Sequence, residues 1–398
     1  MSATHPIFAI GALAAALLAA AVFAYFWPPP LSKRYASLDG LRGLLATLVV
    51  IHHAAIWRFY ARTGEWALPP SRLYSHFGQS SVALFFMITA FLFGAKLLEG
   101  RARPVDWLRM YVSRVLRIVP LYFFFVGVLV VIAITASRLT LRESWLRLGL
   151  NIAHWLAFAI VDMPTLNRFE APIIGGAAWS LAYEWWFYLA LPALGLLAGL
   201  RRQPGWLVAA SGGAAMLAGY WITTRGGWPI AAMFLGGCLA AVLIRQPRLR
   251  DIARHPASTI LALAALGAAA RTPATFDAAS TVLLVAGFLP IACGNTLFGL
   301  LTIAPMRTLG AMSYSLYLLH GIGLYLAFSS LGAGAAARLT PVQHWLVVFV
   351  AVPLIVGMCR LTFLAIEAPA MAAVDGATAR VRTLVHRAPV KAQATAGE

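Results

Sequence analysis

The sequence predicts an all-α fold, a polytopic bundle of transmembrane helices without a separate soluble domain. Of the 398 residues, 61% are apolar and only 11% are charged, whereas an average soluble domain has about 25% charged residues. The apolar residues form long runs that match the hydrocarbon core of a bilayer, which is about 30 Å thick. The basic residues lie mainly between these runs, as expected for loops at the membrane surface.

Eleven apolar runs are expected to span the membrane, one extra N-terminal helix followed by a core of ten. The first run covers residues 5–27, stops at three consecutive prolines and has no Lys or Arg before it. Its length and flanks favour a retained span over a cleaved signal peptide. The ten core spans are expected near residues 39–60, 77–98, 115–136, 176–199, 205–223, 228–244, 256–270, 280–300, 310–331 and 343–366.

Positive charge orients these spans. The segment 137–175 is rich in charged residues, and we expect its apolar part, 148–161, to lie in the outer interface without crossing the membrane. Most of the 31 Lys and Arg residues then fall on the cytoplasmic side, which puts the N-terminus outside and the C-terminus in the cytoplasm. We therefore expect an integral multi-pass protein, with the bacterial inner (cytoplasmic) membrane as its predicted location.

The chain is predicted to have three parts. Residues 1–32 form the extra N-terminal transmembrane helix and a linker, and residues 33–370 form the ten-helix transmembrane domain. Residues 371–398 are short and polar, and we expect them to be a disordered cytoplasmic tail. The lipid bilayer is therefore one predicted partner of the protein.

Composition also excludes several functions. The net charge of +18 does not indicate nucleic-acid binding, because the basic residues lie between apolar runs and form no soluble basic face. Cys238, Cys293 and Cys359 all lie in apolar segments without CxxC spacing, so we expect free, buried thiols. The sequence predicts no metal site and no permanently bound cofactor.

Arg42 and His53 form the first candidate site. They are eleven residues apart, which is about three helical turns, so both side chains lie on one face of one helix, about 16 Å apart along its axis. Ionisable groups inside a membrane are costly and usually face a cavity or a partner. Asp39 precedes Arg42 by one turn, and we expect it to cap the helix start or to pair with Arg42.

The predicted topology puts His53 and Glu184 at a similar depth, because their helices cross the membrane in opposite directions. A carboxylate at this depth would hold the imidazole in one tautomer and stabilise its protonated form, as the orienting acid of a catalytic triad does. The structural alternatives are an ion pair or tyrosine contact for Glu184, and a packed, hydrogen-bonded role for His53. His52 points about 100° away and is predicted to be structural.

Two further clusters carry candidate residues. Arg114 and Arg117 lie one turn apart on one helix face at the cytoplasmic surface. Paired guanidiniums bind phosphates with forked, charge-assisted hydrogen bonds, although membrane anchoring alone also explains them. Ser313, Tyr317 and His320 recur at helical spacing and form an inward polar stripe, for which hydrogen bonding between helices is the structural alternative.

With these residues identified, residues 33–370 resemble the membrane acyltransferase-3 family. The resemblance rests on four segments in order: SLDGLRG with the Arg42 to His53 spacing, the Arg114 and Arg117 pair before IVPLY, WSLAYEWWFYL, and SYSLYLLH. Glu184 matches the first of two carboxylates that the third segment often carries, and Trp185 takes the second place. The extra N-terminal span lies outside the usual core.

The resemblance implies a membrane O-acyltransferase that moves an acyl group, commonly acetyl, from cytoplasmic acyl-CoA to a hydroxyl on the outer side of the membrane. The acceptor is expected to be a glycan, a glycolipid or another hydroxyl compound. The implied catalytic residues are His53, as general base or acyl acceptor, together with Arg42 and Glu184. The acyl-CoA phosphates are expected at Arg114 and Arg117, and the supporting residues are Asp39, Ser180, Ser313, Tyr317 and His320.

Two other classes of function remain open at this stage. A transporter or flippase of a polar or lipid-linked substrate also places Arg, His and Glu inside the membrane. It would move its substrate without acyl-CoA, and it would usually show internal repeats or broken helices. A non-catalytic sensor or scaffold is the third reading, although a scaffold has no need to bury these charges.

Overall fold

The computed structural model describes residues 2–28, 35–102, 104–158, 160, 162–200 and 203–387. In these ranges the regular elements are helices, with one isolated bridge between Leu166 and Phe169. The predicted all-α fold is confirmed. The helices are α1 (Pro6–Phe26), α2 (Ala36–Thr63), α3 (Arg72–Glu99), α4 (Trp107–Ala136), α5 (Trp145–Leu156), α6 (Pro172–Gly175), η1 (Gly176–Ala178), α7 (Trp179–Leu197), α8 (Gly205–Thr224), α9 (Trp228–Leu243), α10 (Pro247–Arg254), α11 (Pro256–Ala269), α12 (Ala278–Ala292), η2 (Leu300–Thr302), α13 (Ala304–Ala311), α14 (Ser313–Ser329), α15 (Ala333–Arg338), α16 (Pro341–Thr362), η3 (Phe363–Glu367), α17 (Ala368–Ala372) and α18 (Val374–Arg387).

Several of these helices are long and apolar enough to cross a membrane, so the chain is a multi-pass membrane protein. Among the described residues six pass by length and composition: α1 to α4, α8 and the stretch Pro341–Ala372. Two bent pairs raise the number to eight, with bends of 109° between α9 and α10 and 76° between α13 and α14. Each of the eleven predicted runs contains a helix, but α11 and α12 have only 14 and 15 residues.

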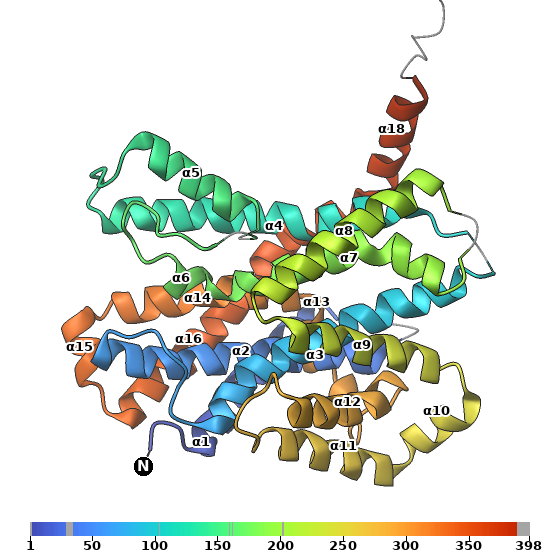
Figure 1. Cartoon of the computed structure of the whole chain (residues 1–398). Helices are drawn as coiled ribbons and strands as arrows, with labels where there is room; N and C mark the ends of the chain where they lie inside the picture. Colours follow the sequence, from blue (N-terminus) through green and yellow to red (C-terminus); the bar gives the residue numbers. More distant parts are fainter. Residues whose placement is uncertain are drawn as a thin grey trace, which may run out of the picture.

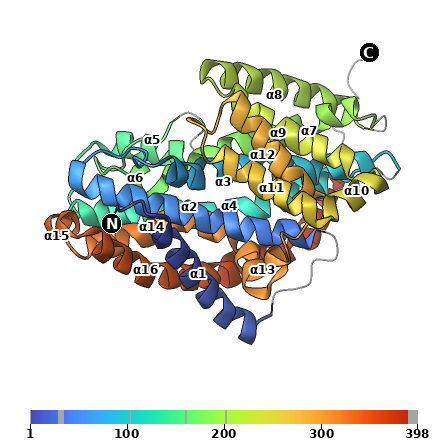
Figure 2. The ribbon, with the colours of Figure 1, turned by 90° about the horizontal axis from the view of Figure 1, so that it is seen from below.

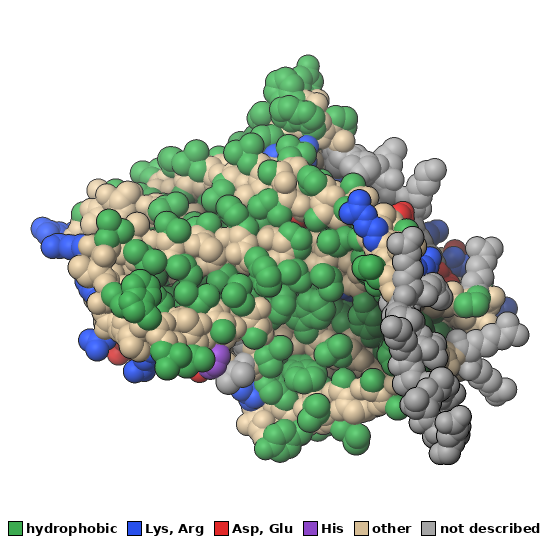
Figure 3. Space-filling view, turned by 90° about the horizontal axis from the view of Figure 1, so that it is seen from above, with side chains coloured by type: hydrophobic (Ala, Val, Ile, Leu, Met, Phe, Trp, Pro, Cys, Tyr) green, Lys and Arg blue, Asp and Glu red, His purple; other side chains and the backbone are tan. Residues whose placement is uncertain are grey.

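The long helices run roughly side by side (Figure 1), and α2 lies among them, packed against α3, α13 and α14. Helix α1, the extra N-terminal helix, packs against α13 and α16 at one side of the bundle (Figure 2). Its contact face is a row of small residues, since Ala12, Ala16 and Ala20 are buried. Figure 3 shows hydrophobic side chains over most of the face in view, with Lys and Arg gathered toward its two ends.

The start of α2 touches the backbone of α13 and η2. A Cβ added at Gly40 would lie 1.8 Å from the Leu301 carbonyl oxygen, and one at Gly310 would lie 1.9 Å from the Asp39 carbonyl oxygen. Only glycine permits this approach at either position. Gly40, the first glycine of the SLDGLRG segment, therefore fixes the position of α2, and with it the positions of Arg42 and His53.

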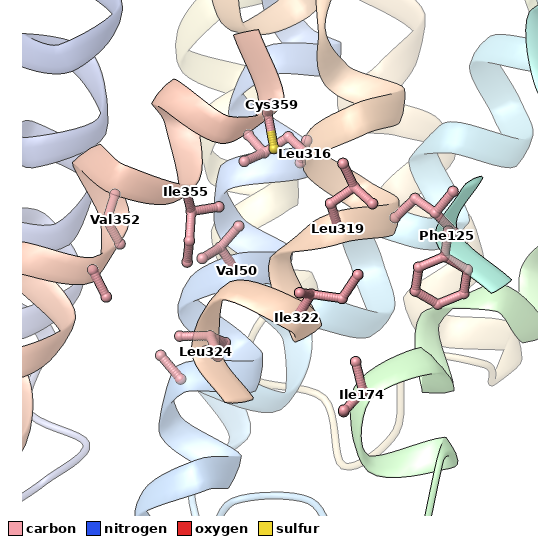
Figure 4. Close-up of a cluster of buried hydrophobic side chains, with 14 of the residues drawn as sticks. Val50, Phe125, Ile174, Leu316, Leu319, Ile322, Leu324, Val352, Ile355 and Cys359 are labelled. Carbon is pink, nitrogen blue, oxygen red and sulfur yellow. The ribbon is translucent and has the colours of Figure 1, made fainter. Parts of the chain in front are cut away.

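Helix α14 packs its apolar side chains into a hydrophobic core that it shares with neighbouring helices. Figure 4 shows side chains of α2, α4, α6, α14 and α16 meeting in this core, which is buried throughout. Cys359 is part of it, and Cys238 and Cys293 are also free thiols. The labelled members are Val50, Phe125, Ile174, Leu316, Leu319, Ile322, Leu324, Val352, Ile355 and Cys359.

The C-terminal tail differs from the expectation of disorder. It forms α18, which projects from the bundle in Figure 1 and ends at Arg387. Two ion pairs tie α18 to the start of α4: Asp375 lies 2.7 Å from Arg109, and Arg382 bonds Asp106. Residues 388–398 and 29–34, which include the end of the predicted N-terminal linker, lie outside the described residues.

Helix α5 coincides with most of the apolar segment that we expected in the outer interface. It lies beside α4 (Figure 1), and the Ser144 side chain caps its first turn. Leu148 and Trp155 are buried, whereas Trp145 and Leu146 are largely exposed. An amphipathic helix of this kind suits a position along a membrane surface.

Candidate functional site

Two neighbouring cavities contain most of the predicted site residues. The first, here called the arginine cavity, has a volume of about 390 Å³ and is lined by Arg42, Arg109, Arg114 and Arg117 among others. The second, here called the histidine cavity, has a volume of about 400 Å³ and is lined by His52 and His53. Among the described residues, only Val82 and Tyr317 line both cavities. These two side chains therefore form the wall between them.

The arginine cavity combines four guanidinium groups, one from α2 and three from α4. The Arg114 guanidinium lies 5.3 Å from the centre of the Phe93 ring, and Arg117 Nη1 lies 2.8 Å from Met371 Sδ. Arg109 donates to Asp375, and this hydrogen bond lowers the pKa of the Asp375 carboxyl, so the pair stays charged at neutral pH. A cavity with this excess of guanidiniums suits a ligand that carries several phosphates.

Glu184 belongs to the arginine cavity and makes its hydrogen bonds there. It accepts from the Tyr188 hydroxyl at 2.8 Å and from the Thr89 hydroxyl at 3.5 Å, and it interacts electrostatically with Arg42 and Arg114. The expected hydrogen bond from His53 to Glu184 is not formed, because the two residues line different cavities.

His320 takes the position beside His53 that we had expected for a carboxylate. His320 Nε2 lies 3.1 Å from His53 Nδ1. His53 Nδ1 also lies 3.0 Å from the Val49 carbonyl oxygen, and His320 Nδ1 lies 3.1 Å from the Leu316 carbonyl oxygen. Carbonyl oxygens only accept, so each Nδ1 carries a proton and His320 Nε2 accepts from His53.

This tautomer leaves His53 Nε2 with a free lone pair. His53 is only half-buried and lines the histidine cavity, and its ring stacks against Trp66 at a centroid distance of 6.2 Å. His52 packs edge-on against His53 at 4.9 Å and donates from Nδ1 to the Tyr74 carbonyl oxygen at 2.7 Å. His52 therefore has the same tautomer, but it is only 5% exposed. Because His53 is the more exposed of the two residues, its Nε2 is the nitrogen in the histidine cavity that is better placed to accept a proton or attack a carbonyl carbon.

Of the supporting residues, Tyr317 lines both cavities and Ser180 and Ser313 line the arginine cavity, whereas Asp39 and His320 line neither. The Tyr317 hydroxyl lies 2.8 Å from both the Ala177 carbonyl oxygen and Ser180 Oγ. Ser313 lines the arginine cavity, and its buried hydroxyl has no hydrogen-bond partner among the described residues. Asp39 lies in the first turn of α2, but no side chain caps this helix, so the expected cap is absent.

Sequence reasoning missed Glu367, which directly follows the last predicted span, 343–366. This carboxylate is 1% exposed and accepts a hydrogen bond from Ser315, while its Oε2 has no partner in the described part of the chain. It interacts electrostatically with Arg117 and Arg42. The sequence did carry one signal for a buried carboxylate, since Glu367 directly follows an apolar run. The π-helical turn η3 that buries this side chain cannot be predicted from the hydropathy pattern.

The described residues contain no group of three or more His, Cys, Asp or Glu that could hold a metal ion. The described side chains of the candidate site surround two cavities, one lined by guanidiniums and one lined by His52 and His53.

A family model described as an acyltransferase domain matches residues 35–361 of the chain. The match covers the chain from the residue before α2 almost to the end of α16, and so includes both imidazoles and all four arginines of the cavities. Neither a curated protein nor a solved structure is significantly similar to the chain.

Proposed function

Because the chain belongs to the acyltransferase family whose model covers residues 35–361, we propose that it is a membrane O-acyltransferase that uses acyl-CoA. Its acyl group, most simply acetyl, would go to a hydroxyl of a glycan or glycolipid on the outer side of the membrane. One observation carries the proposal. A cavity rich in arginine and a cavity with a free imidazole nitrogen share one wall, as a donor site and an acceptor site need to do.

The donor binds in the arginine cavity. Coenzyme A carries a diphosphate and a 3′-phosphate, and the guanidiniums of Arg42, Arg114 and Arg117 supply charge-assisted donors for them. The unpartnered hydroxyl of Ser313 is available to an amide of the pantetheine arm. Glu184 lies among these cations and limits the net positive charge of the cavity.

The acceptor binds in the histidine cavity, where His53 Nε2 takes the proton of its hydroxyl group. The hydroxyl oxygen attacks the thioester carbonyl carbon, the carbon–sulfur bond breaks, and the coenzyme A thiolate leaves and takes the proton from Nε2. If His53 accepts the acyl group first, the same nitrogen attacks the thioester, and the acyl group then passes to the hydroxyl oxygen. Either route needs the Nδ1-protonated tautomer that His320 and Val49 favour.

Acetyl-CoA binding and CoA release by the purified protein in nanodiscs test this proposal. We expect Arg117→Ala to weaken acetyl-CoA binding about tenfold or more, since charge-assisted hydrogen bonds are lost. His53→Ala should abolish turnover and leave binding intact. Arg248→Ala is the matched control, because Arg248 is exposed and lines neither cavity.

The opposite results would reject the proposal. Normal CoA release by His53→Ala would remove the role of His53 in transfer, and unchanged affinity in Arg117→Ala would remove the phosphate site. If the wild-type protein binds no acyl-CoA of any chain length, transport of a polar or lipid-linked substrate becomes the better explanation of the cavities.

A further inference from the structure

Tyr317 occupies the boundary between the two cavities. It comes from α14 and lines both the arginine cavity and the histidine cavity, a position that it shares, within the described part of the chain, only with Val82 of α3. The tyrosine ring is much the larger of the two side chains, so it makes up most of the wall. An acyl group that is to reach His53 from the arginine cavity must pass beside this ring.

The ring is anchored at both its tip and its sides. Its hydroxyl donates to the Ala177 carbonyl oxygen and accepts from Ser180, each at 2.8 Å. The Phe85 ring packs edge-on against it at 5.8 Å, and the His320 ring lies 6.5 Å away. Rotation of the side chain would break two buried hydrogen bonds, and leaving such groups unpaired is costly.

The backbone that carries these anchors is also fixed. Gly321 lies one turn beyond Tyr317 on α14, and a Cβ there would lie 2.0 Å from the Ile174 carbonyl oxygen. Helix α14 therefore rests directly on the α6 backbone, which continues into η1 and the start of α7, where Ala177 and Ser180 lie. The distance from the tyrosine to its two hydrogen-bond partners is consequently set by backbone contact, and the wall has little freedom to widen.

We propose that Tyr317 sets the length of the acyl group that this protein transfers. The inference rests on the proposed function and adds the specificity of its donor site. With the thioester carbonyl carbon at His53 Nε2 or at an acceptor oxygen beside it, the remaining carbons of the acyl group lie against the Tyr317 ring. An acetyl group has one such carbon and fits, whereas longer chains collide with the ring.

The test compares acetyl-CoA and butyryl-CoA as donors for the purified protein in nanodiscs, with CoA release as the measurement. In Tyr317→Ala we expect the ratio of kcat/KM for butyryl-CoA to that for acetyl-CoA to rise at least about tenfold. One methylene in an apolar pocket changes such a ratio by about 10- to 200-fold. Tyr317→Phe keeps the ring and loses the anchor, so its ratio should stay near the wild-type value while kcat falls.

Tyr314→Ala is the matched control, since Tyr314 is on the same helix and lines only the arginine cavity. It makes the same change in size, and we expect it to leave the ratio unchanged. Val82→Ala opens the wall from its other side and should raise the ratio in the same direction by a smaller factor. This second variant decides the question if Tyr317→Ala does not fold.

The outcomes separate the inference from the function beneath it. An unchanged ratio in Tyr317→Ala overturns the role of Tyr317, as does an unchanged ratio in Val82→Ala if the first variant is unfolded. In either case, acetyl-CoA turnover by the wild type would still support the proposed function. A similar rise in Tyr314→Ala would show general loosening of the bundle and also overturn it. If the wild type releases CoA from no donor, the proposed function fails and the inference fails with it.

Discussion

The contact between His53 and His320 determines which nitrogen of His53 can act as a base. Both Nδ1 atoms face carbonyl oxygens of their own helices, and the second acceptor for His53 Nδ1 is His320 Nε2. A neutral imidazole has one donor and one acceptor nitrogen. Without His320, only the Val49 carbonyl oxygen would hold the tautomer and the orientation of the His53 ring.

The variant His320→Leu should lower kcat about tenfold to a hundredfold with little change in KM for acyl-CoA. A positioned base contributes factors of about 10² to 10⁴, and a misoriented ring loses part of this. His320→Gln offers a carbonyl oxygen to His53 Nδ1 and should recover part of the lost kcat. CoA release checks both variants, and equal damage by Leu and Gln would indicate a packing role only.

The sequence predicted which residues line the cavities, but not which residue contacts His53. Arg42 and His53 were placed on one helix face by spacing, and each does line a cavity. The partner of His53 was mistaken, because depth in the membrane says nothing about the direction in which a helix turns its side chains. Glu184 and His320 lie on different helices, α7 and α14, and the packing of α14 against α2 brings His320, not Glu184, to His53.

At the scale of elements, the contact of α2 with α13 is what sets the site in place. Gly310 touches the backbone of α2 at Asp39, and Gly40 touches η2. Such backbone contact lets helices approach closely in a membrane, where small residues replace apolar burial as the main source of packing.

Gly310→Ala should therefore destabilise the protein by about 1–3 kcal/mol, the usual cost of an overpacked site. The added Cβ would lie 1.9 Å from the Asp39 carbonyl oxygen. Gly219→Ala in α8 is the matched control, because a Cβ there meets nothing within 4 Å. Thermal unfolding in detergent measures both, and equal melting temperatures would show that the α2–α13 contact can relax.

Some elements were not predictable from the sequence. Hydropathy shows where apolar runs lie, but not that α9 and α10 are bent by 109° or that α13 and α14 are bent by 76°. The polar tail was expected to be disordered, yet residues 374–387 form α18. Asp375 and Arg382 of this helix make ion pairs with Arg109 and Asp106 near the start of α4. Both features depend on contacts distant in the chain, which local composition does not report.

At the scale of the whole molecule, the predicted orientation remains open to a direct test. Positive charge favours the cytoplasmic side for the turn between α9 and α10 and the outer side for the end of α2. Thr63→Cys and Gln246→Cys replace exposed residues at these two positions. We expect a membrane-impermeant maleimide to label Thr63→Cys in intact cells and Gln246→Cys only after permeabilisation, and the reverse pattern would invert the topology.

The all-α bundle itself followed from the sequence because hydrocarbon thickness fixes the length of an apolar run. The predicted positions of the longest runs therefore agree with the helices α1 to α4. The predicted eleven full spans exceed the six to eight candidates among the described residues, in part because α11 and α12 are short. At about 1.5 Å per residue they extend for little more than 20 Å, so their apolar runs do not fill a bilayer in straight helices.

The wall formed by Tyr317 and Val82 has a consequence for the cell as well as for the reaction. Two water-accessible spaces that open toward opposite faces of a membrane would conduct ions if they were joined. Val82 and Tyr317 line both cavities, so in the proposed reaction they would have to keep the two spaces apart while the acyl group is transferred. Such a wall would let the proposed transfer run in an energised membrane without discharging its potential.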